Sequence, residues 1–292
     1  MSTTKAEDVW VVVPVDGRPS AVVYAGDVLW VADDEGGIVR RLDPDDGGLL
    51  GPPITVSPRP AALAGDAEMV WVVDPDGTVT RIDTATATVR GDPLRLGGVL
   101  VSVALDGTRA WVGDIEAGTV RPIDGETGEV GPAVSIPAGV VRLEVVEDRL
   151  WVSGLERTVT PVDLVTLEVG ESIPVGEGPI GMDAADGGLW VANSDAATVS
   201  PLTADDGERR GPDIAVGPAP VAVAVAGDDV WVLDQDGPSL TRIDGRDRTV
   251  VGPSIDLPHR PRGLAVTPAG VWTVGVDPST AVLAPRVTPG SS

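Results

Sequence analysis

Short apolar segments of two kinds alternate along the whole chain. One kind is a run of small apolar residues such as AALA, VAVAVA or GLAV, and the other surrounds a Trp-Val pair, as in LWVAD, VWVVD or LWVAN. A segment of alternating apolar and polar residues follows and ends in Asp, as in IVRRLD, TVTRID and SLTRID. After a turn rich in Gly and Asp comes a fourth segment, such as GPPITV or GPDIAV. Short apolar runs and period-2 alternation, bounded by turn residues, predict four β-strands in each such unit.

The four-segment unit repeats seven times with a nearly constant period. Its tryptophans are Trp30, Trp71, Trp111, Trp151, Trp190, Trp231 and Trp272, at successive spacings of 41, 40, 40, 39, 41 and 41 residues. Eleven residues before the Trp, five units carry Pro19, Pro60, Pro179, Pro220 or Pro261, and the other two carry Leu100 and Val140. A period of about 40 residues with four strands per unit is typical of a propeller blade. The sequence therefore predicts an all-β fold, a seven-bladed β-propeller of four-stranded antiparallel blades.

Each strand of the unit has an expected place in its blade. The small apolar run suits the innermost strand, which is buried on both sides. The Trp-Val strand comes second, with its indole expected to pack between neighbouring blades. The alternating strand comes third, and its final Asp opens a turn into the outermost strand. Because a four-stranded blade cannot bury both faces alone, the blades are expected to stack in a ring.

The last unit ends early, after TAVLAPRV, and lacks a fourth strand. The segment VWVVVPVDGRP at the start of the chain contains the eighth tryptophan, Trp10, and precedes Pro19 as an outermost strand would. Residues 8–16 are therefore expected to complete the last blade and close the ring. A six-bladed ring with a loose N-terminal strand is the alternative. The whole chain, 1–292, is expected to form one domain, with blades at about 18–57, 58–97, 98–137, 138–176, 177–217, 218–258 and 259–287 plus 8–16.

Composition narrows the classes of partner. The net charge of −24 disfavours binding to nucleic acid or to anionic lipid surfaces, both of which are polyanionic. The chain contains no Cys, which excludes disulfides and thiolate metal sites. No apolar stretch is long enough to cross a bilayer, and no secretory signal pattern is present, so we expect no membrane insertion. We also expect a monomer without a cofactor.

The repeated phrase resembles that of the YVTN/NHL-type repeat propellers of bacteria. The resemblance rests on the order Pro, apolar strand, VWVAN/D, TVxRID, turn and GxxIxVGxxP, and it covers essentially the whole chain. That group includes surface and secreted propellers and the extracellular sensor propellers of some actinobacterial kinases. The resemblance implies an extracellular or cell-surface location. It is compatible with sensing, scaffolding, adhesion or catalysis, because one architecture hosts many functions.

A catalytic relative, virginiamycin B lyase, is a seven-bladed propeller of similar length. In that enzyme a His follows the Pro of the last innermost strand, and a Glu lies four residues past the Trp. The matching positions here are Arg262 and Val276, and neither side chain suits the proton transfer required. The single histidine, His259, lies three residues before the matching position. We therefore predict that the chain is not a lyase.

Two groups of charged residues are expected on the face that carries the connections between blades. Twelve residues before the Trp, three consecutive blades carry Arg18, Arg59 and Arg260, and Arg262 and His259 belong to the same sector. Such a cluster suits a carboxylate or phosphate ligand, or else it pairs with neighbouring acids. Three residues past the Trp stand Asp33, Asp74, Asp114 and Asp234. These are weak candidates for a metal site, and the alternative is that they cap turns.

The third candidate site lies inside the channel. Seven residues before each Trp stand Val23, Ala64, Ala104, Glu144, Asp183, Ala224 and Ala265, so Glu144 and Asp183 interrupt an apolar set on adjacent blades. A carboxylate pair in a narrow channel is able to act as acid and base or to hold a cation, whereas Arg142, two residues before Glu144, offers a simple ion-pair partner.

Three functional hypotheses follow from these patterns. The first is a non-enzymatic, sensor-like binding or scaffold propeller that presents a loop-rich face to a protein, peptide or glycan. The alternative is a small-ligand or lyase- or hydrolase-like site at the channel mouth, built from Glu144, Asp183 and the arginine cluster. The third is an engineered or idealised propeller without a natural ligand.

Overall fold

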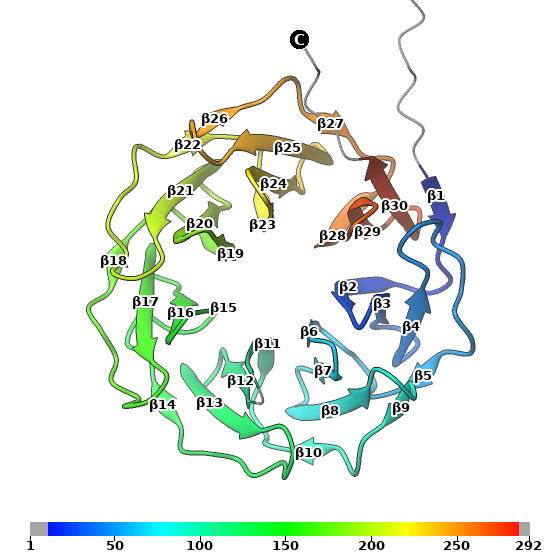
Figure 1. Cartoon of the computed structure of the whole chain (residues 1–292). Coiled ribbons are helices and arrows are strands. Elements are labelled where there is room, and N and C mark those ends of the chain that lie inside the picture. The colour runs from blue at the N-terminus through cyan, green and yellow to red at the C-terminus, as the bar shows by residue number, and fades with distance from the viewer. Residues whose placement is uncertain (1–10, 108, 286–292) are drawn as a thin grey trace, which may run out of the picture.

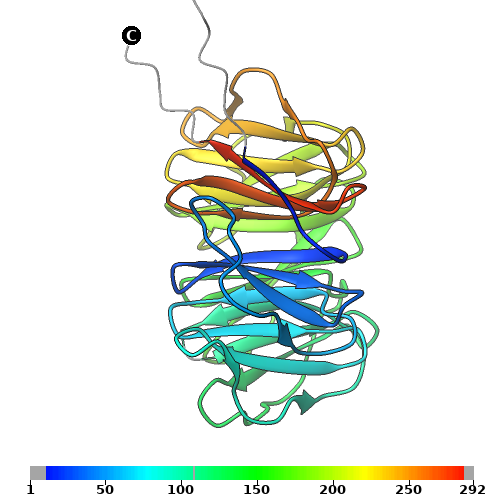
Figure 2. The same ribbon diagram turned by 90° about the vertical axis from the view of Figure 1, so that its right-hand side faces the viewer.

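The computed structural model describes residues 11–107 and 109–285, and it consists of seven antiparallel sheets arranged in a ring (Figure 1). The side view in Figure 2 shows the sheets stacked with their loops on two opposite faces. The predicted seven-bladed, all-β fold is confirmed. Among the described residues, no helix is long and apolar enough to cross a membrane.

The four strands of each blade occupy the predicted order from the channel outward. The innermost strands are β2 (Pro19–Ala25), β6 (Ala62–Gly65), β11 (Leu100–Asp106), β15 (Arg142–Val146), β19 (Pro179–Ala185), β23 (Pro220–Ala226) and β28 (Arg260–Val266). The second strands, which carry the tryptophans, are β3 (Val28–Asp33), β7 (Met69–Val73), β12 (Arg109–Asp114), β16 (Arg149–Ser153), β20 (Gly188–Asn193), β24 (Asp229–Asp234) and β29 (Gly270–Val276).

The third strands are about as long as the second, and the outermost strands are mostly much shorter. The third strands are β4 (Ile38–Leu42), β8 (Thr78–Asp83), β13 (Thr119–Asp124), β17 (Thr158–Asp163), β21 (Thr198–Thr203), β25 (Ser239–Asp244) and β30 (Thr280–Pro285). The outermost strands are β5 (Ile54–Thr55), β10 (Leu94–Arg95), β14 (Val134–Ser135), β18 (Ile173–Pro174), β22 (Ile214–Ala215), β27 (Ile255–Asp256) and β1 (Val11–Pro14). Two further short strands, β9 (Thr88–Val89) and β26 (Thr249–Val250), pair with β8 and β25.

The outermost strand of the seventh blade comes from the other end of the chain. β1 pairs antiparallel with β30, with Val11 opposite Leu283 and Val13 opposite Ala281 (Figure 1). Val13 packs against the buried cluster that contains Trp272, whereas Val12 on the other side of β1 is 50% exposed. Residues 8–10 of the predicted closing segment, with Trp10, and residues 286–287 of the predicted last blade lie outside the described residues.

The hydrophobic core is divided into layers that lie between adjacent blades. One layer combines Trp111 of the third blade with Leu143 and Leu150 of the fourth. The indole of Trp151 donates a hydrogen bond of 2.9 Å to the carbonyl of Ala204, in a turn of the next blade. The seven tryptophans of the second strands are all buried, so the expected packing of the indoles between blades is confirmed.

The turn between the third and outermost strands of the first blade needs glycine, because the indole of Trp272 reaches it. Gly47 has φ +74°, and a Cβ built there would lie 2.8 Å from the ring of Trp272 and 2.5 Å from Val13. The indole of Trp272 also donates a hydrogen bond of 2.8 Å to the carbonyl of Pro44 in the same turn. The first and seventh blades are thus joined by this turn as well as by the neighbouring innermost strands β2 and β28.

The packing of β1 predicts different effects for substitutions on its buried and exposed sides. Substituting Val13→Asp places a charge against the buried cluster around Trp272 and should lower the free energy of unfolding by about 2 kcal/mol or more. The matched substitution Val12→Asp, on the exposed side of the same strand, should change it by less than about 0.5 kcal/mol. Urea denaturation followed by tryptophan fluorescence measures both. If Val13→Asp costs as little as Val12→Asp, the packing of Val13 against the Trp272 cluster does not stabilise the last blade.

Candidate functional site

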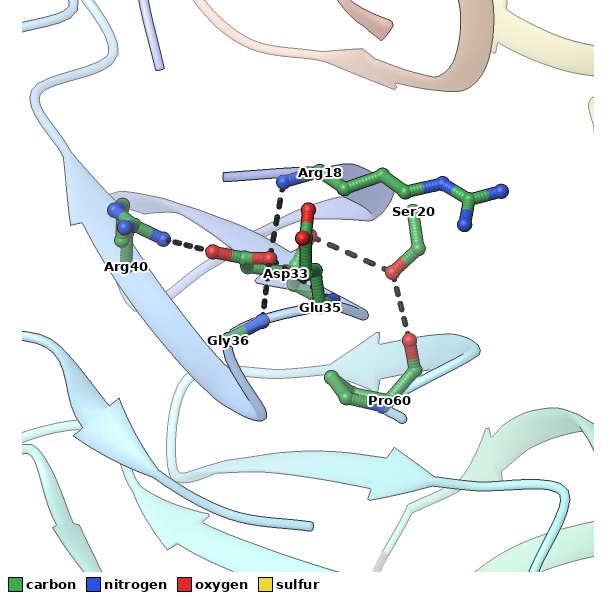
Figure 3. Close-up of polar contacts among 8 residues, drawn as sticks. Arg18, Ser20, Asp33, Glu35, Gly36, Arg40 and Pro60 are labelled. Carbon is green, nitrogen blue, oxygen red and sulfur yellow. Dashed lines mark hydrogen bonds and ion pairs between the residues drawn. The ribbon is translucent and has the colours of Figure 1, made fainter. Parts of the chain in front are cut away.

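The face that we call the loop face carries the connections between blades and the turns between second and third strands. Asp33 is its best-connected residue (Figure 3). Its carboxylate accepts hydrogen bonds from the backbone N–H groups of Arg18 at 3.0 Å and Gly36 at 2.9 Å, and it forms an ion pair with Arg40 at 2.8 Å. Burial by itself would raise the pKa of Asp33, but these hydrogen bonds and Arg40 outweigh it and hold the pKa below its usual value.

The equivalent aspartates make similar bonds in other blades. Asp114 accepts hydrogen bonds from the backbone N–H groups of Val99, Glu116 and Ala117 at 3.0 to 3.2 Å, and Asp74 accepts them from Asp76 and Thr78. These aspartates therefore cap the turns that follow the second strands. Among the described residues, no three His, Cys, Asp or Glu side chains gather as they would around a metal ion.

Asp234, at the same repeat position in the sixth blade, has a different environment. One carboxyl oxygen accepts hydrogen bonds from the hydroxyls of Thr241 at 2.7 Å and Ser239 at 3.2 Å. The other oxygen is buried without a hydrogen-bond partner, and no arginine pairs with this carboxyl. Burial raises the pKa of Asp234 to about 6. One repeat position thus holds carboxyl groups whose pKa values shift in opposite directions.

The arginine cluster is only partly assembled. Arg18 pairs with Asp34 at 3.6 Å and Arg59 pairs with Asp76 at 2.9 Å, each across its own blade, and both guanidinium groups are mostly exposed. Arg260 and Arg262 are exposed, and Arg262 also lines the central channel. Neither of their side chains forms an ion pair with another residue of the described chain. The four arginines therefore divide into two paired groups on the loop face and two free groups at β28.

His259 does not join the arginines. Its imidazole is 2% exposed and lies between two hydroxyls, with Nδ1 2.7 Å from Oγ1 of Thr280 and Nε2 3.2 Å from Oγ1 of Thr273. Burial lowers the pKa of His259 to about 4, so the ring is neutral at physiological pH. The sequence placed it in the basic sector, but it serves the packing of the seventh blade.

The central channel forms a cavity of about 700 Å³ between the innermost strands. All seven residues at the repeat position seven before the Trp line it, which are Val23, Ala64, Ala104, Glu144, Asp183, Ala224 and Ala265. Arg142, Gln235 and Arg262 add polar groups. The charged part of the lining therefore belongs to the fourth, fifth and seventh blades, and the lining from the first three blades is apolar apart from Ser20 and Tyr24.

The two channel carboxyls differ in their bonding. Asp183 accepts hydrogen bonds from the backbone N–H groups of Ala184 at 2.8 Å and of Val225, in the next blade, at 2.6 Å. Burial raises the pKa of Asp183 despite these bonds. Burial also raises the pKa of Glu144 well above its usual value, and repulsion from Asp183 adds to this while Arg142 opposes it.

A second depression, of about 430 Å³, lies on the loop face between the third and fourth blades. We call it the blade 3–4 groove. It is lined by residues 115–118 of one turn, residues 135–139 of the connection, and Leu155 and Glu156 of the next turn. Leu155 is 65% exposed, and its backbone N–H donates a hydrogen bond of 2.8 Å to Ala138.

The groove was missed by sequence reasoning. Two adjacent blades carry a large apolar residue at the position four after the Trp, Ile115 and Leu155. Apolar residues at this turn position in neighbouring blades were the sequence signal for the groove. The fourth blade also lacks the capping Asp, because Gly154 stands there, and a Cβ at that position would lie 2.7 Å from the carbonyl oxygen of Ala138. The turn and the connection therefore meet directly in this blade, without a carboxylate between them.

Comparisons with known proteins identify the fold. No family model matches the chain, and no curated protein matches its sequence. Virginiamycin B lyase from Staphylococcus aureus superposes with a TM-score of 0.81 at 13% identity, covering 96% of this chain and 99% of the lyase. The WD40 domain of Neurospora crassa Pan2 gives 0.78 at 11% identity, covering 97% and 98%, and a chain of the mitotic checkpoint complex gives 0.83 at 12%, covering 97% and 96%.

These similarities agree with the repeat type seen in the sequence, since the neighbours include seven-bladed propellers like virginiamycin B lyase. The same architecture occurs in a lyase and in WD40 domains. The fold alone therefore does not assign an activity to the chain.

The opposite pKa shifts of Asp33 and Asp234 predict opposite responses to the same substitution. Asp33→Asn should destabilise the protein near neutral pH, because the native state favours the ionised form of this group. Asp234→Asn should stabilise it by about 1–2 kcal/mol at pH 8, because the native state there holds a buried carboxylate whose pKa is raised to about 6.

The pH dependence follows from the same signs. As the pH falls below about 6, native Asp234 takes up a proton before the unfolded chain does, so the advantage of Asp234→Asn should shrink between pH 6 and pH 4. The cost of Asp33→Asn should also diminish in acid, as the unfolded chain begins to bind the proton. Urea denaturation at pH 8, at pH 4.5 and at about pH 3 measures both differences, because the Asp33 effect changes only near and below the unfolded-state pKa of Asp, about 4. Parallel pH profiles for the two variants would contradict the assignment.

Proposed function

We propose that this propeller is a non-enzymatic binding module that engages a peptide segment of a partner protein in the blade 3–4 groove. The observation that carries the proposal is Leu155, a large apolar side chain that is 65% exposed beside a depression on the loop face. Its backbone is held by the hydrogen bond to Ala138, so the side chain is presented from an ordered turn. Exposed apolar groups beside a concave surface are typical of interaction sites.

The charge around the groove favours a basic partner. Glu116 and Glu156 line its rim and are exposed, and the chain as a whole has a net charge of −24. Complementary charge speeds association and selects among partners. The preferred peptide segment therefore has an apolar residue that contacts Leu155 and Ile115, and Lys or Arg residues on either side of it. A glycan fits less well, because the seven repeat tryptophans are buried and offer no exposed aromatic surface.

Three observations support a role without catalysis. Arg262 and Val276 occupy the positions at which the lyase-like propeller would need proton-transfer groups, and Val276 is buried. His259 is enclosed between two threonines and stays neutral at physiological pH. The loop-face aspartates accept hydrogen bonds from the turns that they cap. The WD40 domain of Pan2 and a chain of the mitotic checkpoint complex share this fold, so the fold does not by itself imply lyase chemistry.

The experiment is a selection of phage-displayed random peptides on the purified propeller, followed by affinity measurement of the enriched sequences. We expect enriched peptides to contain an apolar residue next to Lys or Arg. Leu155→Glu should weaken their binding at least tenfold, because it replaces the apolar contact with a third acidic group in the groove. Val165→Glu is the matched control, since Val165 is 82% exposed on the same blade but lies in the turn on the opposite face.

Three outcomes of these binding experiments would contradict the proposal. Peptides that bind Leu155→Glu as tightly as the wild-type chain would place the binding surface elsewhere. Enrichment of acidic peptides would point to the free arginines at β28 instead. Glycan-array binding that survives Leu155→Glu, with no peptide enriched, would replace the peptide by a glycan ligand.

A further inference from the structure

The fourth blade contributes two charged side chains to a channel wall that is otherwise mostly apolar. Arg142 and Glu144 both lie on β15 and both line the cavity. They are two residues apart, so their side chains leave the same side of the strand, about 7 Å apart along it. The other blades place small or apolar residues at the position of Arg142, namely Ala21, Ala62, Ser102, Gly181, Ala222 and Gly263.

Polar groups at the same two repeat positions in neighbouring blades have a bonding role in the fold. The hydroxyl of Ser102, equivalent to Arg142, accepts a hydrogen bond of 2.9 Å from the N–H of Leu143 in the next blade. The carboxylate of Asp183, equivalent to Glu144, accepts one from Val225 in the next blade. Each therefore bonds the innermost strand of its neighbour.

Arg142 and Glu144 have no such bonds. Within the described residues, no hydrogen bond or ion pair involves the side chain of either, and they do not pair with each other. The ion pair that the sequence suggested is therefore not formed. Both groups are half-buried, and burial disfavours the charged form of each, lowering the pKa of Arg142 and raising that of Glu144.

Arg142 and Glu144 attract each other, but burial outweighs this attraction for both. Two such charges without hydrogen-bonded partners cost stability unless something binds them. Neither is needed to hold the blades together, because the other blades close the ring without them. The natural complement of an arginine is a carboxylate, which accepts two parallel hydrogen bonds from the guanidinium. The natural complement of Glu144, with Asp183 on the adjacent blade, is a cationic donor such as an ammonium group.

We propose that the channel binds a small zwitterion, a free α-amino acid, with its carboxylate on Arg142 and its ammonium group between Glu144 and Asp183. The two charges of an amino acid lie a few ångströms apart, which suits side chains spaced by about 7 Å on one strand. The cavity of about 700 Å³ exceeds the size of any amino acid. Val23, Ala64 and Ala104, on the first three blades, offer an apolar surface to the ligand side chain. This site is independent of the blade 3–4 groove.

The test begins with thermal shift of the full chain against each standard amino acid at about 10 mM, since a ligand that binds only the native state raises the melting temperature. Calorimetry then compares the best amino acid with its N-acetyl and its amide derivatives. The first lacks the ammonium group and the second lacks the carboxylate. We expect each derivative to bind at least tenfold more weakly than the zwitterion.

Two substitutions in the channel and one outside it locate the binding. Arg142→Met and Glu144→Gln should each weaken zwitterion binding at least tenfold. Both variants should keep or raise the melting temperature without ligand, because each removes an unpartnered charge, so lost binding will not reflect unfolding. Arg59→Met is the control, since that arginine pairs with Asp76 on the loop face, and it should leave binding unchanged.

Three outcomes would overturn the proposal. The first is the absence of any thermal shift with the standard amino acids. The second is a derivative that binds as well as the zwitterion. The third is binding that persists in Arg142→Met and Glu144→Gln. None of these outcomes bears on the peptide selection with Leu155→Glu, so the two proposals fail separately.

Discussion

No blade of this ring buries both of its faces by itself, and the packing of each tryptophan against the following blade resolves that constraint. Trp151 reaches the turn at Ala204, and Trp272 reaches the turn at Pro44 across the junction of the seventh and first blades. The core consequently lies between the sheets. Each blade depends on its neighbours, and the pairing of β1 with β30 gives the last blade an outermost strand, as the others have. Everything on the loop face and in the channel is positioned by this ring.

The same framework produces different electrostatics at equivalent positions. Asp33 sits beside Arg40 and two backbone N–H groups, whereas the sixth blade surrounds Asp234 with hydroxyls and leaves one oxygen without a partner. Equivalent positions of the repeated strands therefore differ in the charge and hydrogen bonding around their side chains. The difference arises because the third strand supplies arginine at Arg40 but threonine at Thr241, at the same distance from the cap.

Both functional proposals depend on the blade that departs most from the repeat. The fourth blade has Val140 in place of Pro, Gly154 in place of the capping Asp, and an exposed Leu155 on the loop face. It also carries two of the three channel charges without a bonded partner among the described residues, the third being Arg262 of the seventh blade. Departures that weaken a repeated framework without a structural compensation are expected at functional sites. A groove for a peptide and a channel for a small zwitterion would make this blade the functional sector of the ring.

The sequence by itself determined the ring, its seven blades, the order of strands, the burial of the tryptophans and the channel-facing positions. These follow from a 40-residue period and from alternation along single strands, which are local properties of the chain. Only the tertiary structure decided that Asp183 accepts a hydrogen bond from the next blade while the side chain of Glu144 forms none. It also decided that Arg18 and Arg59 form ion pairs. Likewise, it decided that His259 is enclosed and that Leu155 borders a groove. These features depend on contacts between blades and between turns that lie some 15 to 40 residues apart in the sequence. Three-dimensional packing sets the hydrogen bonding and burial at such contacts, and the periodicity of the sequence does not encode it.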